Sequence, residues 1–223
     1  MPKSFNPLFV VVEGMEAVGK STVVNYLTTH LNSLSGLDTV NTREPGGTPL
    51  AEAIRDIFKS ELTKGSSSLT QAHLIAAARS DHLDRLIMPM LATDKNVVCD
   101  RFFISTLVYQ DSHDFLFDLN HRLVPDLTIV LTASPENVQK RLAIRADSAQ
   151  QDWLDASVSA RHAAMQEKML DIVRNDEWFE LSKNYLVVDT NQYEDVRSLC
   201  GGIGHDWELE NYFKGANETL CYI

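Results

Sequence analysis

Residues 8–21 read LFVVVEGMEAVGKS, and this stretch decides the fold. Residues 8–12 form a continuous run of aliphatic and aromatic side chains, which is typical of a strand buried on both faces. The remainder fits the pattern G-x-x-x-x-G-K-[ST], and residues 22–34 have the apolar spacing of an amphipathic helix. The sequence therefore predicts a strand, a glycine-rich turn and a helix in succession.

The glycine-rich turn predicts a phosphate-binding site. Such a turn exposes backbone N–H groups that surround phosphate oxygens, and the helix behind it adds its positive N-terminal end. In this interpretation Lys20 reaches the β- and γ-phosphates of a nucleoside triphosphate, and the Ser21 hydroxyl ligates Mg²⁺. The alternative is an accidental glycine-rich turn between a strand and a helix. We expect the triphosphate to contact Gly14, Met15, Glu16, Ala17, Val18, Gly19, Lys20, Ser21 and Thr22.

The composition is that of an ordinary globular protein, with 44% hydrophobic and 23% charged residues among 223. The net charge of −11 argues against nucleic acid as a partner, because such binding needs a broad basic face. No apolar run approaches the roughly 20 residues of a membrane span, and the first residues do not resemble a signal peptide. The three cysteines show no CxxC spacing, and their odd number does not suit a framework of disulfides. We therefore expect a reduced, cytoplasmic protein with no membrane partner.

Strand and helix patterns alternate along the whole chain. Strands are predicted at residues 8–12, 39–42, 96–99, 127–131 and 185–188. Helices are predicted at residues 22–34, 49–60, 69–91, 104–110, 135–145, 154–174 and 193–200. Five short buried strands separated by helices predict an α/β fold with an open, mainly parallel sheet. Because no linker interrupts the pattern, we expect residues 1–223 to form one domain, with a tail at residues 201–223 that the pattern does not assign.

Charged residues follow two further predicted strands. Arg43 comes directly after the second strand, and Asp100 and Arg101 come directly after the third. In an open α/β sheet, ligands bind beyond the carboxyl ends of the strands, where the glycine-rich turn also lies. We interpret the two arginines as ligands of a second anionic group. The alternative is that they pair with Glu44 and Asp100 at the surface.

Three further segments resemble the thymidylate kinase family, and its bacterial branch in particular. Residues 42–52, TREPGGTPLAE, match the segment after the second strand in that branch. Residues 100–110, DRFFISTLVYQ, match its DR[YHF]xxS…YQ signature, and residues 77–79, AAR, match the end of its acceptor-site helix. The resemblance covers roughly residues 8–145. It implies a P-loop NTPase fold with a five-stranded sheet and a small helical lid at about residues 141–155.

The resemblance also implies how an acceptor nucleotide binds. Arg43 and Arg101 would hold its 5′-phosphate, because forked guanidinium donors match phosphate geometry. Glu16 would meet the sugar 3′-hydroxyl and the acceptor phosphate region, and Asp100 would join Ser21 in holding Mg²⁺. The residues implied around the acceptor are Glu16, Arg43, Ile75, Arg79, Arg101, Ser105, Thr106, Tyr109 and Gln110.

The resemblance implies that residues of the predicted helices 69–91 and 104–110 recognise the base and the sugar. Arg79 would donate to a base carbonyl, Thr106 would lie near the pyrimidine N3 edge, and the Tyr109 ring would crowd a 2′-hydroxyl. Because Thr106 and Tyr109 are three residues apart on one predicted helix, core-facing positions are the alternative. Gln110 could equally be a solvated helix residue.

Two features depart from the family pattern. Ile75 stands where the family usually has a Phe that stacks on thymine, and stacking contributes roughly 1–3 kcal/mol per base in nucleic-acid sites. The pocket thus has room for dUMP or a modified pyrimidine nucleotide, as in a divergent or virus-encoded member. The predicted lid lacks Arg at residues 147–155, so we expect Arg145, and next Arg141, to neutralise charge on the transferring phosphoryl group. An exposed basic helix face is the alternative for both arginines.

The resemblance implies a nucleoside monophosphate kinase that transfers a phosphoryl group from ATP to dTMP, or a related deoxypyrimidine monophosphate, for dTTP synthesis. The acceptor phosphate is already anionic, so positioning and charge neutralisation suffice. The expected catalytic residues are Lys20, Arg101, Arg145 and Glu16, and Arg141 is expected to contact ATP. A nucleoside kinase with Glu13 or Glu44 as base, a kinase for another deoxynucleoside monophosphate and a catalytically weak binding module are the alternatives. The resemblance also implies a homodimer.

Overall fold

A computed structural model describes residues 6–110, 122–146, 161–175, 181–192 and 221–222 of the chain. Its strands form one sheet in the order β2-β3-β1-β4-β5-β6, and every pair in it is parallel. The strands are β1 (Phe9–Gly14), β2 (Thr39–Arg43), β3 (Asn96–Asp100), β4 (Leu127–Thr132), β5 (Tyr185–Asp189) and β6 (Cys221–Tyr222). The five predicted strands and the parallel α/β fold are confirmed. The two-residue β6 lies in the tail that the pattern did not assign.

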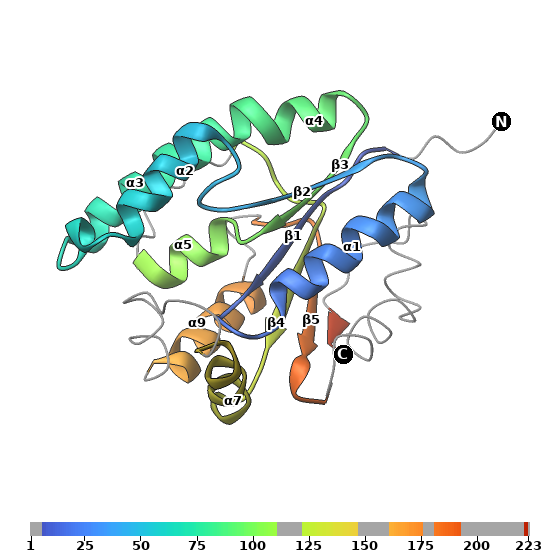
Figure 1. The fold of residues 1–223 in the computed structure, drawn as a ribbon. Coiled ribbons are helices and arrows are strands. Elements are labelled where there is room, and N and C mark those ends of the chain that lie inside the picture. Colours follow the sequence, from blue (N-terminus) through green and yellow to red (C-terminus); the bar gives the residue numbers. More distant parts are fainter. Residues whose placement is uncertain (1–5, 111–121, 147–160, 176–180, 193–220, 223) are drawn as a thin grey trace.

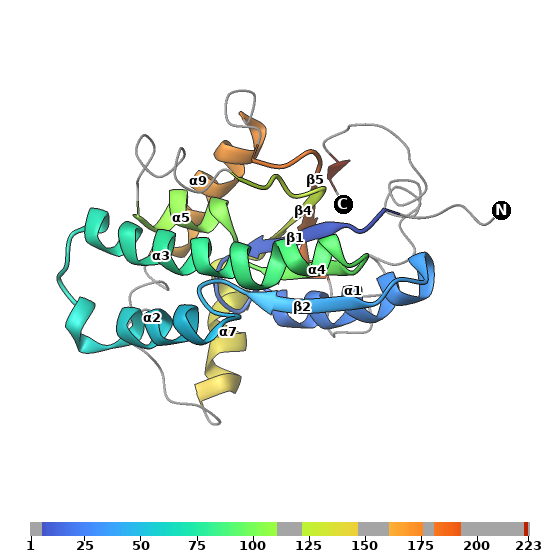
Figure 2. The same ribbon diagram turned by 90° about the horizontal axis from the view of Figure 1, so that it is seen from above.

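Helices cover both faces of the sheet. Figures 1 and 2 show α1 on one face and α5 and α9 on the other, with α2 and α3 side by side near the edge strand β2. The helices are α1 (Lys20–Ser35), α2 (Pro49–Lys59), α3 (Ser68–His82), α4 (Met88–Ala92), α5 (Phe103–Gln110), α7 (Pro135–Ala146) and α9 (His162–Arg174). Among the residues described, none of these helices is long and apolar enough to cross a bilayer.

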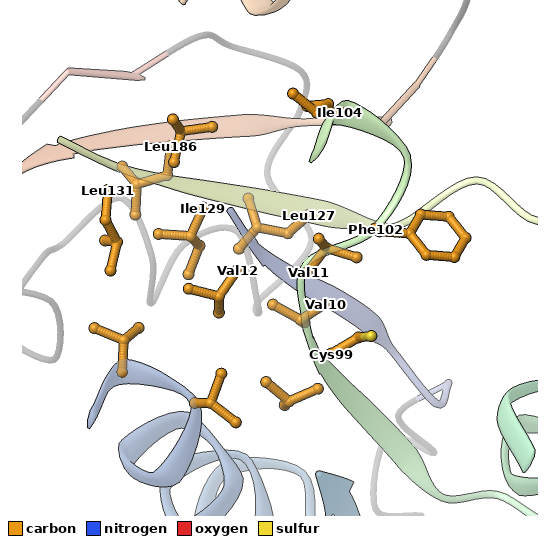
Figure 3. Packing of buried hydrophobic residues seen from close by; sticks show 14 of the residues in the cluster. Val10, Val11, Val12, Cys99, Phe102, Ile104, Leu127, Ile129, Leu131 and Leu186 are labelled. Atoms are coloured by element: carbon orange, nitrogen blue, oxygen red, sulfur yellow. The ribbon is translucent and has the colours of Figure 1, made fainter. Parts of the chain in front are cut away.

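The hydrophobic core centres on β1, which lies between β3 and β4. All six residues of β1 are buried. Because successive strand side chains point to opposite faces, Val10, Val11 and Val12 contribute to the core on both sides of the sheet. Figure 3 shows them among buried side chains of the neighbouring strands, including Leu127 and Ile129. Burial on both faces explains the continuous apolar run at the start of the sequence.

Two differences from the predicted elements have physical causes. The expectation of buried strands is wrong for β2, which pairs only with β3 among the described strands and is largely half-exposed. The helix predicted at residues 69–91 changes to a π-helical turn, η2 (Leu83–Ile87), between α3 and α4. Pro89 follows this turn, and its ring would meet the carbonyl of residue 85 in a regular α-helix. A wider turn removes that clash. The helix predicted at residues 193–200 and the start of the one at 154–174 lie outside the described residues.

The glycine-rich turn packs tightly against β4. Gly14, which ends β1, has a φ of 145°, and a Cβ on it would lie 2.6 Å from the Leu131 carbonyl oxygen. Gly19 has a φ of 103° and directly precedes α1, which begins at Lys20 rather than at residue 22 as predicted. Only glycine combines these backbone angles with such a close approach of two backbone segments.

We predict that Gly14→Ala lowers the free energy of unfolding by about 2 kcal/mol or more, because it adds a backbone clash to an unfavourable φ. Gly36→Ala is the matched control, because Gly36 also has a positive φ (69°) but a Cβ on it would meet nothing within 4 Å. It should cost about 1 kcal/mol. Urea unfolding of both variants measures the difference. Equal losses would contradict the close packing of the turn on β4.

Candidate active site

Three strands end side by side at one edge of the sheet. Asp100, at the end of β3, lies opposite Arg43 at the end of β2 and opposite Val12 near the end of β1. The glycine-rich turn, residues 14–21, leaves β1 at the same edge. The structure therefore brings the turn together with Arg43, Asp100 and Arg101, as the parallel arrangement requires.

Lys20 lies buried against the glycine-rich turn. Its Nζ donates a hydrogen bond to the Met15 carbonyl oxygen at 2.7 Å. Burial, together with the nearby positive charge of Arg101, lowers the pKa of Lys20 to about 8. From α7, the guanidinium of Arg141 donates to the Ala17 carbonyl at 3.3 Å. Two backbone carbonyls of the turn thus accept hydrogen bonds, one from Lys20 and one from Arg141.

Arg101 is fixed by an ion pair across the site. Its Nη2 donates to Glu16 Oε1 at 2.6 Å, and the two side chains are 19% and 20% exposed. Nη1 donates to Ser105 Oγ at 3.2 Å and to the Tyr109 hydroxyl at 3.3 Å. The Tyr109 ring lies under the guanidinium, whose carbon is 5.2 Å from the ring centroid. Arg101 therefore pairs with Glu16, rather than with Asp100 as the surface alternative proposed.

The charge of Glu16 is stabilised by the same cluster. Burial alone would raise the pKa of Glu16, but the charges of Arg101 and Lys20 and the Tyr109 hydroxyl outweigh it. That hydroxyl lies 2.8 Å and 2.9 Å from the two carboxylate oxygens. The pKa of Glu16 therefore lies below its ordinary value, and the carboxylate stays ionised between the turn and α5.

Glu13 joins the end of β1 to the start of α5. Its carboxylate is fully buried, and its Oε1 accepts from the backbone N–H groups of Phe102 (2.8 Å) and Ser105 (3.1 Å). The Ser105 hydroxyl donates to Oε2 at 2.6 Å. These bonds satisfy N–H groups at the start of α5. They also fix the backbone beside Arg101, whose φ is 70°.

Arg79 is buried between α3 and α5. Its Nε donates to Glu44 Oε2 at 2.6 Å, and its Nη2 donates to Thr106 Oγ1 at 2.8 Å. The guanidinium carbon lies about 5 Å from the ring centroids of Phe102 (5.1 Å) and Phe103 (4.9 Å). The Thr106 hydroxyl therefore contacts Arg79 rather than a purely apolar core. Arg79 itself is 2% exposed, so the packing around it fixes its orientation.

Arg43 lies at the rim of the site with a second arginine that the sequence did not single out. Its Nη2 donates to both carboxylate oxygens of Glu52, at 3.0 Å and 2.9 Å, and not to Glu44 as the surface alternative proposed. Burial and the charge of Arg43 lower the pKa of Arg55, and the charge of Arg101 adds to this effect. Three guanidinium groups are thus close enough to repel one another, which favours an anionic ligand between them. The sequence did contain one indication of Arg55, because residues 52 and 55 are three apart on a predicted helix and so lie on the same face.

Ile75 and Gln110 are both buried, at 6% and 5% exposure. They lie on α3 and α5, which pack against each other beside Arg79. The solvated alternative for Gln110 is therefore wrong. Arg145 lies in α7, but its side chain is not among those described, and most of the predicted lid, residues 147–155, lies outside the described residues.

Two side chains at this edge carry oxygen atoms that would suit a magnesium ion. Asp100 Oδ1 is buried without a hydrogen-bond partner among the described groups, and such an atom favours a cation or water. Ser21 lies exposed in the first turn of α1. The described residues contain no cluster of three or more acidic, His or Cys ligands. That donor set fits Mg²⁺, which takes one or two protein oxygens and fills its other positions with phosphate and water.

Comparisons with known proteins agree on one family. The family model of thymidylate kinase matches residues 12–198. The thymidylate kinase of Symbiobacterium thermophilum is 38% identical over 94% of this chain and 97% of its own length. That of Nitrobacter hamburgensis is 35% identical over 87% of this chain and 85% of its own.

Solved structures give the same result. The thymidylate kinase of Ehrlichia chaffeensis superimposes with a TM-score of 0.64 at 25% identity, over 89% of this chain and 96% of its own. The thymidylate kinase of Candida albicans has the same fold, with a TM-score of 0.70 at 19% identity over 95% of each chain.

We predict that Glu16→Gln lowers the free energy of unfolding by about 1–2 kcal/mol at pH 7, because Arg101 loses its partner carboxylate. The pKa of Glu16 in the folded protein lies below the ordinary value of 4.5. The stabilisation is therefore complete above that value and is lost as the pH falls through the folded pKa. Urea unfolding from pH 7 to pH 3 should show the difference between wild type and variant shrinking. A difference that does not change with pH would contradict a charged Glu16–Arg101 pair.

Proposed function

The chain belongs to the thymidylate kinase family of nucleoside monophosphate kinases, and we propose that it transfers the γ-phosphoryl group of ATP to dTMP, giving ADP and dTDP. One observation carries this proposal. Arg101 is held by Glu16 and Tyr109 at the rim where the glycine-rich turn lies. A fixed guanidinium beside a triphosphate cradle is suited to a second phosphate group.

The two phosphate groups would be held by different residues. Backbone N–H groups of residues 14–22 and Lys20 would surround the ATP phosphates, and Arg141 would line the donor side. Arg43, Arg55 and Arg101 would hold the acceptor phosphate, which reduces their mutual repulsion. Ser21 and Asp100 would hold Mg²⁺, which neutralises charge on the phosphate oxygens when bound.

The carboxylates of the site support a monophosphate acceptor over a nucleoside. A nucleoside hydroxyl would need a general base, for which Glu13 and Glu44 were the candidates. Glu13 already accepts three hydrogen bonds from the start of α5, and Glu44 is paired with Arg79. A phosphate acceptor is anionic and needs no base, so these carboxylates can remain structural.

Base and sugar recognition would come from α3 and α5. Arg79 would donate to a base carbonyl and Thr106 would lie near the N3 edge, since the two side chains are already bonded to each other. The Tyr109 ring would exclude a 2′-hydroxyl. Ser105 and Gln110 would line the same side of the acceptor site. Ile75 would give an apolar contact without ring stacking, so dUMP is the closest competing substrate.

The chain also suits one domain and an assembly of two subunits. We propose one kinase domain over residues 1–223, with a lid at about residues 141–155 in which Arg145 neutralises the transferring phosphoryl group. We also propose a cytoplasmic homodimer. Four exposed apolar side chains support helix packing between subunits, because they lie on α2, α3 and the short segment between them: Leu50 (52%), Ile57 (44%), Leu62 (82%) and Leu69 (53%).

ADP release with Mg-ATP across dTMP, dUMP, dCMP, dGMP, UMP and thymidine tests the proposed function. We expect dTMP to have the highest kcat/KM. A preference for another monophosphate would mean that the substrate is not dTMP, and Ile75 would be the first residue to substitute. Activity on thymidine alone would favour a nucleoside kinase, and binding without turnover would favour a nucleotide-binding module.

Arg101→Ala separates the two kinase alternatives in the same assay. Loss of the acceptor-phosphate contact should lower kcat/KM for dTMP about 100-fold or more, with little change in ATP binding. Arg122→Ala is the matched control, because Arg122 pairs with Asp84 at the surface and should leave turnover unchanged. Retained dTMP turnover in Arg101→Ala would remove Arg101 from the proposed site.

A further inference from the structure

We propose that His82 is a positioning residue for the monophosphate acceptor, which rests on the function proposed above. His82 ends α3, and its side chain is fully buried. Its imidazole contacts Thr42 and Glu44, the residues on either side of Arg43. One side chain thus contacts both neighbours of Arg43, and one of them, Glu44, is also the ion-pair partner of Arg79.

The two ring nitrogens of His82 have different partners. Nε2 lies 2.7 Å from Thr42 Oγ1, near the end of β2. Nδ1 lies 3.2 Å from Glu44 Oε1, in the turn that follows. Because a carboxylate can only accept, Nδ1 carries the hydrogen and donates it. The imidazole therefore ties the end of α3 to both residues that flank Arg43.

Glu44 transmits this constraint to Arg79. Its other oxygen, Oε2, accepts from Arg79 Nε at 2.6 Å, and the side chains of Glu44 and Arg79 are 3% and 1% exposed. Arg79 and His82 lie one turn apart on the same face of α3, so both hold the one carboxylate. Without His82, Oε1 loses a buried donor, and the carboxylate is free to rotate away from the orientation that holds Nε.

The turn between β2 and α2, which follows Arg43, packs directly against the imidazole. A Cβ on Gly47 would lie 2.5 Å from both His82 Nε2 and Thr42 Oγ1. Gly47 also has a φ of 85°, so glycine is required there for two reasons. Because Gly47 packs closely against the imidazole and the imidazole contacts both neighbours of Arg43, we expect the backbone at Arg43 to depend on His82.

Two polar substitutions separate the two contacts of His82. His82→Asn places an amide nitrogen where Nδ1 lies and keeps a donor to Glu44, whereas His82→Gln places its amide nearer the Nε2 position and loses that donor. Calorimetric titration with dTMP should show binding weakened about tenfold or more in His82→Gln and within about threefold of wild type in His82→Asn. ATP affinity should stay within about twofold of wild type in both variants.

His162→Asn is the matched control for loss of a buried imidazole. His162 is 1% exposed, and its Nε2 lies 3.1 Å from the Ala133 carbonyl oxygen after β4. This variant should lower the thermal unfolding midpoint without changing the ratio of dTMP to ATP affinity. If His82→Gln binds dTMP as wild type does, or if His162→Asn shifts the ratio equally, the positioning role of His82 is wrong.

Turnover of the wild-type protein with dTMP, measured separately, distinguishes failure of this inference from failure of the proposed function. Absent turnover together with the predicted binding pattern would refute the kinase activity and support the role of His82. Normal turnover with unchanged dTMP affinity in both His82 variants would refute the role of His82 and leave the function standing. Absent dTMP binding in the wild type would refute both.

Discussion

The site depends on two carboxylates, one half-buried and one buried, that hold guanidinium groups in place. Glu16 pairs with Arg101 and Glu44 pairs with Arg79, each through a donor–acceptor distance of 2.6 Å. A buried charge without a partner costs several kcal/mol, so these arginines have few alternatives to their present orientations. The proposed acceptor site is therefore organised by the protein itself, and a nucleotide that binds there would not have to order the arginine side chains.

Other carboxylates of the site also have a structural role rather than that of a general base. Glu13 lies at the end of β1, where a carboxylate near a phosphate cradle first suggested a general base. Instead it accepts backbone N–H groups at the start of α5 and so fixes the segment that begins with Arg101. Glu52 likewise accepts from the Gly47 N–H and from Arg43, and holds the turn before α2. In this site the carboxylates position the cations that we propose bind the phosphates.

The parts of this arrangement that depend on local sequence could be predicted. The continuous apolar run at residues 8–12 and the glycine spacing at residues 14–19 specify β1 and the phosphate cradle, because a few adjacent residues determine both. Arg43 and Arg101 could be predicted because they directly follow strands. Their partners Glu52 and Glu16 could not, since those pairs depend on tertiary contacts between segments up to 85 residues apart. The i, i+3 spacing from Glu52 to Arg55 was visible in the sequence, but the proximity of Arg55 to Arg43 depends on the folded turn between them.

The central claim is that one rim of the sheet binds a nucleoside triphosphate and a deoxynucleoside monophosphate side by side. Titration with a compound in which adenosine and deoxythymidine are joined through five phosphates tests this most directly. We predict that it displaces both ATP and dTMP and binds more tightly than either nucleotide, because the second contact becomes intramolecular. Displacement of ATP alone, with an affinity no better than that of ATP, would contradict the claim.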